Sequence, residues 1–460
     1  MPQYYSGSEL TGTHPSHDYA PLRLAGLGLS AMLVPLGSTM IAVALPAIGV
    51  EFARAPGDLT QWLVNSYLLI NVVALGPAGK LADQWGYKNA LRLGQVIFGL
   101  GCVLPIVLHF FEALVVSRVL MALGGALMVP TVMAVVKITV PAEKRHRVFG
   151  YFGAMMGFAA ALGPSLGGFL VHQFGWASIF WMNLPPLLFS IYFSREFFRD
   201  RVHATSIVAF TFDWRGTLLM AGGLVCLVIG LKDHSLLLVP AAILLLAFIW
   251  WQRKAAQPLI DTALFANRHF AAGCAIVALQ NLSMYALLFQ LPFLLTLLYQ
   301  WGPQQSGYYM TSFMISMMAA SALGGRVAEK IGVRATCVIG ALISCIGLYW
   351  LSNLVPGKDP LHVVGGLVLG GTGLGLGNGP SQSAAMATVD MKLSGIASGV
   401  ISTCRYLGGV TGISILGMLL AAPASAQSLA QYHQAILVFA GAFLVAAAVA
   451  LLLPGRVKPV

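Results

Sequence analysis

Residues 79–88 read GKLADQWGYK, and residues 325–334 read GRVAEKIGVR. In both segments a glycine and a basic residue are followed by an apolar residue, an alanine and an acidic residue. A second glycine and a second basic residue then follow at the same spacing. Each segment lies between two long apolar stretches. This match at equivalent positions predicts that the chain is built from two similar parts.

Apolar stretches continue on both sides of these segments along almost the whole chain. Hydrophobic residues make up 58% of the 460 residues and charged residues only 9%, which excludes an ordinary soluble domain. A helix of roughly 20 apolar residues spans a bilayer, because it satisfies its own backbone hydrogen bonds. The predicted spans are 23–47, 61–79, 88–109, 112–139, 149–172, 177–195, 214–232, 235–252, 271–299, 306–325, 335–354, 361–388, 395–421 and 433–453.

Basic residues gather in every second gap between these spans. The opposite gaps contain little beyond Arg54, Lys232 and Lys358. By the positive-inside rule, we expect both termini on the cytoplasmic side of a cell (inner) membrane. The same distribution accounts for the net charge of +11, so we expect no nucleic-acid partner. The clustered basic residues are Lys80, Lys88, Arg92, Lys144, Arg145, Arg147, Arg195, Arg199, Arg201, Arg253, Lys254, Arg268, Arg326, Lys330, Arg334, Lys392, Arg456 and Lys458.

The expected fold class is an all-α integral membrane protein with about 14 transmembrane helices. Repeats of this kind are typical of transporters with two six-span halves. Counting from the repeat leaves two central helices as an insert between the halves. The predicted parts are an N-terminal tail at 1–22, an N-terminal half at 23–200, a linker with the two inserted helices at 201–268, a C-terminal half at 269–454 and a short tail at 455–460.

Several segments resemble those of a known transporter family. Residues 79–88 resemble the signature cytoplasmic loop of the major facilitator superfamily, and Arg118 resembles its second motif. Residues 163–168, GPSLGG, resemble the antiporter motif of its drug exporters. The segments that resemble the fourteen-span drug/proton antiporters are Leu36–Pro46, Asn183–Pro185 and Phe212–Gly216. The resemblance covers nearly the whole chain and implies the major facilitator fold, with alternating access between the two halves.

The repeated loop is expected to act in conformational change. Gly79 and Gly86 allow a tight turn, and Asp83 can accept hydrogen bonds at a neighbouring helix N-terminus. Lys80 and Lys88 can find an acidic partner or anionic lipid. We expect the loop to be a latch that favours one access state. The alternative is a solvated loop whose charges only set the topology.

The Gly-Pro segment is expected to shape the access route. Pro164 removes a backbone hydrogen bond and should bend its span, while Gly163, Gly167 and Gly168 let another helix approach closely. The alternative is a packing kink without a role in transport.

One charge of the resembled family is missing. Its members usually carry an aspartate directly after the leucine of the first-span motif and an asparagine five residues later; this chain has Gly37 and Ala42 there. No Asp or Glu lies near the middle of any predicted span. Arg118 and Arg405, however, are predicted within spans, where an arginine is costly and is normally paired or functional.

Arg118 has two interpretations. It either bonds carbonyls and hydroxyls of neighbouring helices or snorkels to the outer face, or it lends positive charge to a cavity suited to an anionic or zwitterionic amphiphile. Arg405 lies deeper in its span and is the better candidate to face a cavity. Polar side chains that are candidates for lining the same cavity are Ser38, Thr39, Asn65, Asn71, Gln280, Asn281, Tyr285 and Gln290. Each of them alone is more often a helix–helix contact.

The sequence is best explained by a secondary transporter that exports drug-like or amphiphilic small molecules, as in multidrug efflux by an antiporter. The alternative is a transporter of anionic lipids or acidic metabolites with weak or no proton coupling, since no mid-span carboxylate is present to titrate. An intramembrane enzyme would need paired aspartates or an H-E-x-x-H motif, which the sequence lacks. A receptor on a transporter scaffold would usually bring a longer cytoplasmic domain.

The expected partners are a small-molecule substrate and the lipid bilayer, and the expected state is a monomer. No G-x-x-x-x-G-K-[ST] motif is present to bind a nucleotide. We therefore expect no catalytic residue, no metal site and no cofactor.

Overall fold

The computed structural model describes residues 21–140, 142–197, 213–232, 235–255, 258–357, 359–389, 394–420 and 429–455. Within these residues all regular secondary structure is helical. The long helices follow the predicted apolar spans one for one. They are α1 (Pro21–Glu51), α3 (Ser66–Trp85), α4 (Tyr87–Val107), α5 (Phe111–Thr139), α6 (Ala142–Phe174), α8 (Leu184–Phe197), α9 (Trp214–Lys232), α10 (Leu238–Gln252), α11 (Arg268–Tyr299), α12 (Pro303–Ile331), α13 (Val333–Leu351), α14 (Pro360–Met386), α15 (Ser394–Leu419) and α16 (Leu429–Ala450).

Short helical segments lead into several of them. The helix α2 (Pro56–Leu59) and a π-helical turn, η1 (Thr60–Asn65), run without a break into α3. The helix α7 (Ser178–Trp181) precedes α8, and the 3₁₀ turns η2 (Ser235–Leu237) and η3 (Thr262–Ala266) precede α10 and α11.

Eleven helices in the described part of the chain are long and apolar enough to cross a membrane. The predicted spans outside this set correspond to α3, α8 and α12. The helix α8 has only 14 residues, and α12 carries Arg326, Glu329 and Lys330 in its last turns. The all-helical architecture is thus observed in the described residues, whereas the count of fourteen spans remains a prediction.

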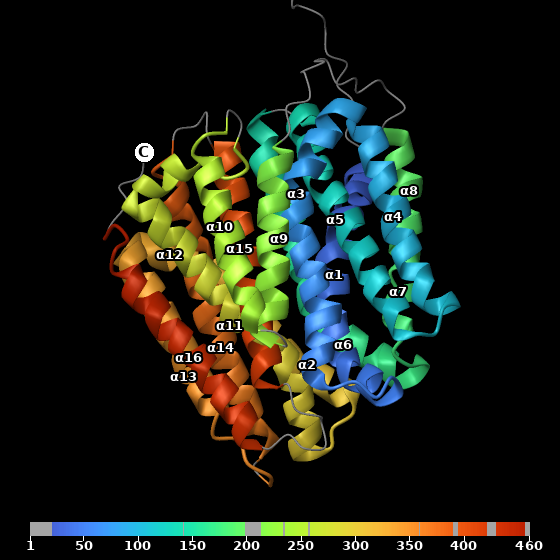
Figure 1. Ribbon diagram of the computed structural model, residues 1–460, viewed down its shortest axis with the longest axis vertical. Coiled ribbons are helices and arrows are strands. Elements are labelled where there is room, and N and C mark those ends of the chain that lie inside the picture. The colour runs from blue at the N-terminus through green and yellow to red at the C-terminus, as the bar shows by residue number, and fades with distance from the viewer. Residues whose placement is uncertain are drawn as a thin grey trace, which may run out of the picture.

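The long helices run alternately up and down through one elongated bundle (Figure 1). The start of α1 and the end of α16 therefore belong to the same side of the molecule, which we call the termini face. The turns that hold α2, η2 and the start of α12 belong to the opposite side, which we call the far face.

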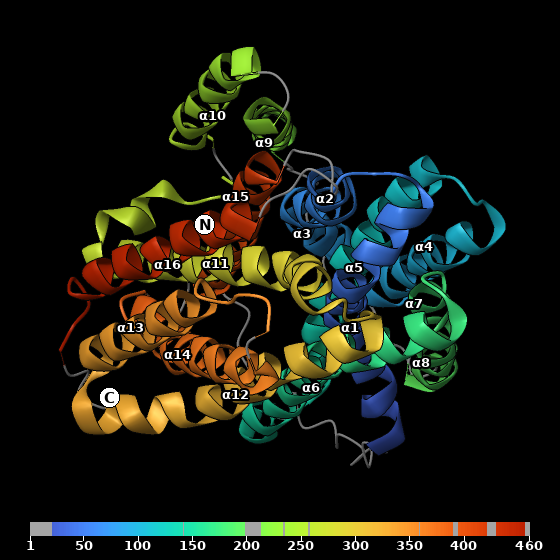
Figure 2. The same cartoon turned by 90° about the horizontal axis from the view of Figure 1, so that it is seen from below.

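Two groups of helices pack within themselves. In the first, α1 packs against α5, α6 and α8, and α5 packs against α3 and α4. In the second, α14 packs against α11, α12 and α13, and α16 packs against α11 and α13. Viewed from below, the groups lie side by side, with α1, α11, α6 and α12 along their boundary (Figure 2). We call them the N-terminal and C-terminal halves.

The helices α9 and α10 form a hairpin at the edge of the bundle (Figure 2). Helix α9 packs against α3 of one half and α15 of the other, whereas only 17% of the apolar stretch Ser235–Gln252 is buried inside the protein. The exposed side chains of α10 are apolar, among them Ile243 and Leu246, as expected for a surface that faces lipid tails.

Asp213 holds the termini-face end of this hairpin together. Its Oδ1 accepts hydrogen bonds from the Gly216 amide (2.8 Å) and from Nε1 of Trp251 (2.7 Å). Its Oδ2 accepts one from Nε2 of Gln252 (2.6 Å), and the side-chain Oε1 of Gln252 accepts one from the Ile260 amide. The carboxylate therefore caps α9 and also ties it to the end of α10. Phe212, the first residue of this motif, lies outside the described residues.

The two halves touch through small residues. The carbonyl oxygen of Pro164 in α6 lies directly against Gly307 in α12, and the carbonyl oxygen of Pro303 lies against Gly168. A Cβ on either glycine would collide with these backbone atoms. Because Gly168 is near the end of α6 and Pro303 begins α12, this contact belongs to the far-face part of the molecule.

The second seam, between α3 and α15, also closes towards the far face. Nδ2 of Asn65 donates a 3.0 Å hydrogen bond to Oγ of Ser414. Gly57 lies against the backbone of Gly417, near the end of α15, and of Leu420, which follows that helix. Helices α6 and α12 on one side, and α2, α3 and α15 on the other, thus bring the halves together near the far face.

Candidate substrate site between the halves

Carboxylates are found only near the ends of the described helices. Glu51, Glu112 and Glu329 lie within three residues of the end of a helix, as do Asp83, Glu143 and Glu196 along the backbone. Asp213, Asp261 and Asp359 precede helices and accept hydrogen bonds from backbone amides at their starts. The ionic groups in the interior of the described bundle are therefore guanidinium groups.

Arg118 is enclosed by the N-terminal half. Its side chain is 1% exposed, and its guanidinium group lies 4.2 Å from the ring centre of Tyr67. Nε donates a 3.0 Å hydrogen bond to the carbonyl oxygen of Leu63, and Nη1 donates a 3.2 Å hydrogen bond to that of Gly37. Nη2 has no hydrogen-bond partner. Arg118 thus connects α5 to α1 and to the π-helical turn through carbonyls and an aromatic ring, as the first of its two interpretations anticipates.

The position of the missing family carboxylate lies beside this arginine. A Cβ on Gly37 would lie 3.2 Å from Cε of Met121 and 3.7 Å from Oδ1 of Asn183. Asn183 is fully buried, and its Oδ1 has no hydrogen-bond partner. Ala42 is also fully buried. The neighbours of Arg118 in the described part of the chain are therefore neutral groups.

Arg405 occupies the middle of α15 and is half-buried. Its Nη2 donates a 2.7 Å hydrogen bond to Oε1 of Gln382 in α14. Gln382 is held in turn by Asn378, because its Nε2 donates to the Asn378 side-chain oxygen at 2.5 Å and to the Asn378 carbonyl oxygen at 3.2 Å. This guanidinium group is partnered by a neutral amide and remains partly accessible.

Three tyrosines lie near one or the other of the two arginines. Tyr285 of α11 is close enough to interact electrostatically with Tyr67, Tyr406 and Arg405, while Tyr67 lies under Arg118. The Tyr285 ring packs on Gly409, whose Cβ position is 2.9 Å from the ring, and is stacked with Phe289. Tyr67 and Tyr406 were not expected from the sequence, because a tyrosine in an apolar span gives no signal that separates a cavity wall from a lipid-facing surface. The sequence signal for them is their position along the chain, since Tyr67 is two residues after Asn65 and Tyr406 directly follows Arg405.

The polar candidates in α1 and α3 mostly bond locally. Ser38 and Thr39 each donate to the Pro35 carbonyl oxygen, and Asn71 donates to the Tyr67 carbonyl oxygen. Asn65 reaches across the boundary to α15. Asn65 therefore contributes to the seam between the halves, while the others satisfy carbonyls of their own helices.

The polar candidates in α11 lie mainly inside the C-terminal half. Gln290 donates to the Tyr432 carbonyl oxygen in α16, and Asn281 donates to the Val277 carbonyl oxygen of its own helix. Gln280 is buried with both amide atoms unpartnered, 2.7 Å from where a Cβ on Gly377 of α14 would be. Tyr285 is the member of this group that the structure brings to the arginine–tyrosine cluster.

The Gly-Pro segment of α6 packs between two helices. Gly163 and Gly167 lie against Thr39 and Met40 of α1, whereas Pro164 and Gly168 lie against α12. Ser165 and Thr311 share a short hydrogen bond between their hydroxyl groups. Every part of the segment therefore faces another helix, and half of it forms the boundary between the halves.

The repeated loop turns tightly at glycine. Gly86 has φ +82° and Gly332 has φ +93°, and each separates two helices. Only glycine adopts this backbone region readily. Gly79 and Lys88 are half-buried in the adjoining helices. The side chains of Lys80 and Asp83 lie outside the described set, so the latch stays a prediction.

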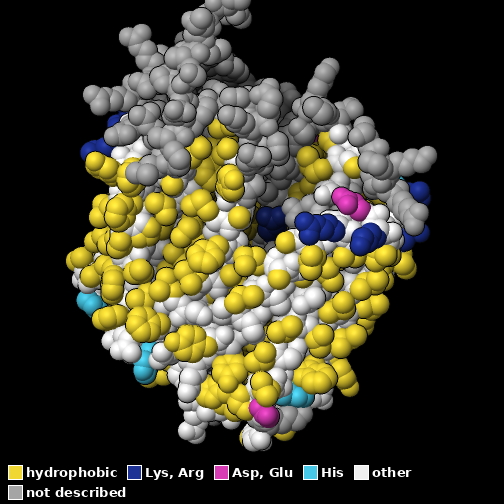
Figure 3. Space-filling view, turned by 180° about the vertical axis from the view of Figure 1, so that it is seen from behind, with side chains coloured by type: hydrophobic (Ala, Val, Ile, Leu, Met, Phe, Trp, Pro, Cys, Tyr) yellow, Lys and Arg dark blue, Asp and Glu magenta, His cyan; other side chains and the backbone are white. Residues whose placement is uncertain are grey.

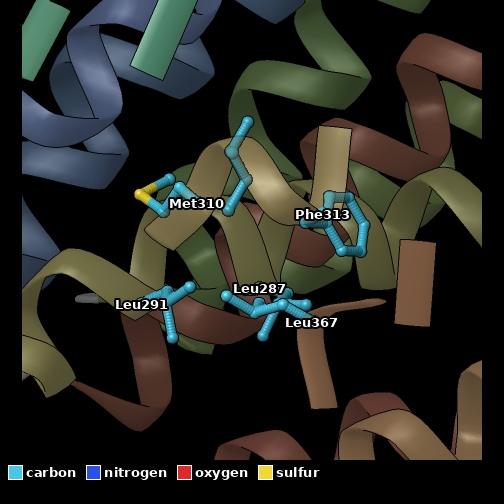
Figure 4. A pocket seen from close by; sticks show the side chains of 6 residues that line it. Leu287, Leu291, Met310, Phe313 and Leu367 are labelled. Carbon is cyan, nitrogen blue, oxygen red and sulfur yellow. The ribbon is translucent and has the colours of Figure 1, made fainter. Parts of the chain in front are cut away.

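A hollow between the halves opens near the termini face. From behind, the surface is hollowed next to the residues drawn in grey, and Lys and Arg side chains lie in and beside the hollow (Figure 3). A separate apolar gap of about 10 Å³ lies among Leu287, Leu291, Met310, Phe313 and Leu367 of the C-terminal half (Figure 4). It is too small for more than one water molecule, so it is a packing defect and not a substrate site.

Comparison with protein families decides the fold. The family model of the Major Facilitator Superfamily matches residues 27–413, and again residues 274–459. The chain belongs to the major facilitator superfamily. This confirms the expected superfamily, and it makes the protein a multi-pass membrane protein of a transporter family.

Several bacterial members of this superfamily are similar in sequence. The MFS-type transporter YvkA of Bacillus subtilis is 33% identical over 86% of this chain and 90% of its own length. The multidrug resistance protein Stp of Mycobacterium tuberculosis is 30% identical over 88% and 76%. The tetracenomycin C resistance and export protein of Streptomyces glaucescens is 29% identical over 86% and 75%.

Solved structures show the same fold. A peptide transporter of the POT family, in an auto-inhibited form, has a TM-score of 0.69 at 16% identity and covers 96% of this chain and 98% of its own. The nucleoside transporter NupG has a TM-score of 0.64 at 13% identity, covering 93% and 98%. At these identities the likeness concerns the fold alone.

Proposed function

We propose that this major facilitator protein exports amphiphilic, drug-like small molecules from the cytoplasm by alternating access between its two halves. The observation that carries the proposal is the cluster of Arg118, Tyr67, Tyr285, Tyr406 and Arg405, which has contributions from both halves at their boundary. Aromatic walls with a few polar groups suit bulky amphiphiles better than small ions. Relatives named for multidrug resistance and for export of tetracenomycin C support the same direction.

The membrane orientation proposed from the basic loops determines which access state this conformation represents. If the termini face is cytoplasmic, the halves are in contact near the periplasmic or outer side, and the hollow in Figure 3 lies nearer the cytoplasmic side. This is the state that would load a substrate for export. The contacts of Gly168, Gly307, Asn65 and Ser414 would then be the ones that separate when the transporter turns outward.

The predicted motifs take roles in this cycle. We assign Gly163, Pro164, Gly167 and Gly168 to the boundary that opens and closes, and Gly79, Asp83, Gly86 and Lys88 to a latch at the cytoplasmic end. The substrate would be contacted mainly by Arg405 and Tyr285. Asn65 would act at the contact between α3 and α15. The walls of the substrate cavity would be supported by Arg118, Ser38, Thr39, Asn71, Asn281, Gln280 and Gln290.

We further propose that coupling to protons is weak. A coupling site needs a group that titrates while the cavity changes sides, and the carboxylates of the described helices lie at their ends. Arginine stays protonated and cannot take this role. A substrate gradient, or a charge on the substrate itself, would then supply the driving force.

A transporter of acidic metabolites or anionic lipids is the second candidate. The half-buried Arg405, which has a neutral partner, favours it. Under either candidate the protein works in the cell (inner) membrane as a monomer that moves a small molecule without chemical conversion.

The test is transport by purified protein in proteoliposomes. Cationic, neutral and anionic amphiphiles of matched size are loaded, with and without an imposed pH gradient. We expect substrate movement that changes little with the gradient. Strong gradient-driven accumulation that is lost when Glu112 or Asp390 is neutralised would contradict weak coupling, and no movement of any amphiphile would contradict export.

A further inference from the structure

The two intramembrane arginines differ in what remains available to a ligand. Arg118 is 1% exposed, and backbone carbonyls and the Tyr67 ring surround it. Arg405 is half-buried and donates one hydrogen bond from Nη2 to Gln382. A guanidinium group carries five N–H donors, so most of the donors of Arg405 have no acceptor among the described residues.

Among the described helices of its half, none supplies a carboxylate partner to Arg405. Helices α11, α13, α14, α15 and α16 contain no Asp or Glu at any position. The acidic residue of α12, Glu329, lies in its last turn at the termini face. A cation in mid-span is costly unless it is paired or reaches water, and Arg405 is the twelfth residue of the 26-residue α15.

The neutral partners hold this guanidinium group in place. Because Nε2 of Gln382 is used to bond Asn378, its Oε1 is directed at Arg405. Gln382 and Asn378 thus orient the Nη2 edge of the planar guanidinium group of Arg405 and leave its other N–H groups unused. A planar guanidinium matches two oxygens of a carboxylate, and such charge-assisted hydrogen bonds are the strong ones.

We propose that Arg405, oriented by Gln382 and Asn378, is a subsite for the oxyanion of an amphiphilic ligand, with Tyr285 and Tyr406 beside the ligand's apolar body. The inference rests on the proposed export function and narrows its substrate class to amphiphiles with a carboxylate or a similar oxyanion. Two sources share this chemistry: a free amphiphilic acid and the headgroup of an anionic phospholipid.

The experiment measures binding of three matched probes to the purified full-length protein in phosphatidylcholine nanodiscs. The probes are 1-pyrenebutyrate, its neutral amide and its trimethylammonium analogue. Wild type should bind the carboxylate at least about tenfold more tightly than the amide, because hydrogen bonds to a charged group are stronger than those to a neutral one. Arg405→Ala should abolish this preference, and Arg405→Lys should keep part of it, since lysine retains charge without the fork.

Gln382→Glu is the sharper variant, because it leaves Arg405 in place. A carboxylate 2.7 Å from Nη2 would occupy the guanidinium group internally, so the preference for the anionic probe should disappear. Gln382→Leu should keep part of that preference, since Arg405 loses the amide that orients it but no competing charge is introduced. Arg253→Ala is the matched control: it removes an exposed cation at the end of α10 and should change nothing.

Equal affinity of wild type for the three probes, or an unchanged preference in Arg405→Ala and Gln382→Glu, would overturn the subsite. Adding phosphatidylglycerol to the nanodiscs separates the two sources: competition with the carboxylate probe assigns the subsite to a lipid headgroup, and absence of competition assigns it to a free acid. Transport of all three probes in proteoliposomes at rates that are equal in wild type and Arg405→Ala would refute the subsite and leave export standing. Absence of transport for all three probes would instead refute export.

Discussion

Nη1 of Arg118 lies 3.2 Å from the carbonyl oxygen of Gly37, the residue at which the resembled antiporters carry an aspartate. The arginine thus contacts the backbone at the position from which the carboxylate is missing. The Cβ position of Gly37 is near the flexible end of Met121 and the unpartnered Oδ1 of Asn183. A short side chain therefore fits there with a small shift of the Met121 methyl group.

Gly37→Asp should make transport sensitive to pH. The new carboxylate would lie in a buried site beside Arg118 and would titrate as the site changes exposure during the cycle. We expect an imposed gradient of one pH unit to change the initial transport rate about threefold or more, against little change in wild type. Gly37→Asn is the isosteric control without a titrating group. Equal pH dependence in both variants would show that size and not charge is responsible.

Arg118→Ala should destabilise the protein more than Arg405→Ala. Arg118 loses hydrogen bonds to Gly37 and Leu63 and its contact with Tyr67, which together are worth about 2 kcal/mol or more. Arg405 loses a single bond to a half-buried amide. Thermal unfolding in nanodiscs measures the difference. A larger loss of stability in Arg405→Ala would contradict the division into a structural and a ligand-binding arginine.

Ser414→Ala should weaken closure near the far face. It removes the acceptor of the 3.0 Å hydrogen bond from Asn65, a loss of about 1 kcal/mol that shifts the two access states about fivefold. Spin labels on α2 and on the end of α15 would report a larger separated population. Ser402→Ala is the control, because that hydroxyl bonds only the Ser398 carbonyl of the same helix. An unchanged distance distribution in Ser414→Ala would show that this bond does not bias the states.

Gly307→Ala should impair transport strongly. Its Cβ would collide with the carbonyl oxygen of Pro164, and a backbone atom cannot move aside as the end of a flexible side chain can. We expect the halves to separate between α6 and α12, with transport reduced about tenfold or more. Gly302→Ala, where a Cβ meets nothing within 4 Å, should transport normally. Normal transport by Gly307→Ala would show that α6 and α12 can move apart without impairing transport.

Much of the architecture could be predicted from the sequence because a membrane imposes few solutions. Apolar length and alternating basic gaps predict each long helix, and the repeat of 79–88 at 325–334 predicts the two halves. The tight turns at Gly86 and Gly332 follow from the same repeat, since both need a positive φ.

The interior of the site could not be predicted as well. Polar residues in a span can bond their own helix, as Asn71 and Asn281 do, or pack within one half, as Gln290 does. Sequence alone does not separate these cases, because each depends on which face of the helix meets a neighbour. Tyr67 and Tyr406 show the converse: their place beside the arginines depends on the contact between α3 and α15.

The π-helical turn at Thr60–Asn65 changes which face of the second span is directed at its neighbours. Such a turn contains one residue more than α-helical winding needs, and each residue turns a helix by about 100°. A single helical wheel drawn through 56–85 therefore assigns the wrong face to one of its ends. Deleting one residue within 60–65 would rewind this stretch and rotate Gln61, which bonds the Val228 carbonyl oxygen, away from the inserted hairpin. The extra residue of the π-helical turn therefore lies where the two halves and the hairpin meet, since Gln61 contacts α9 and Asn65 contacts α15.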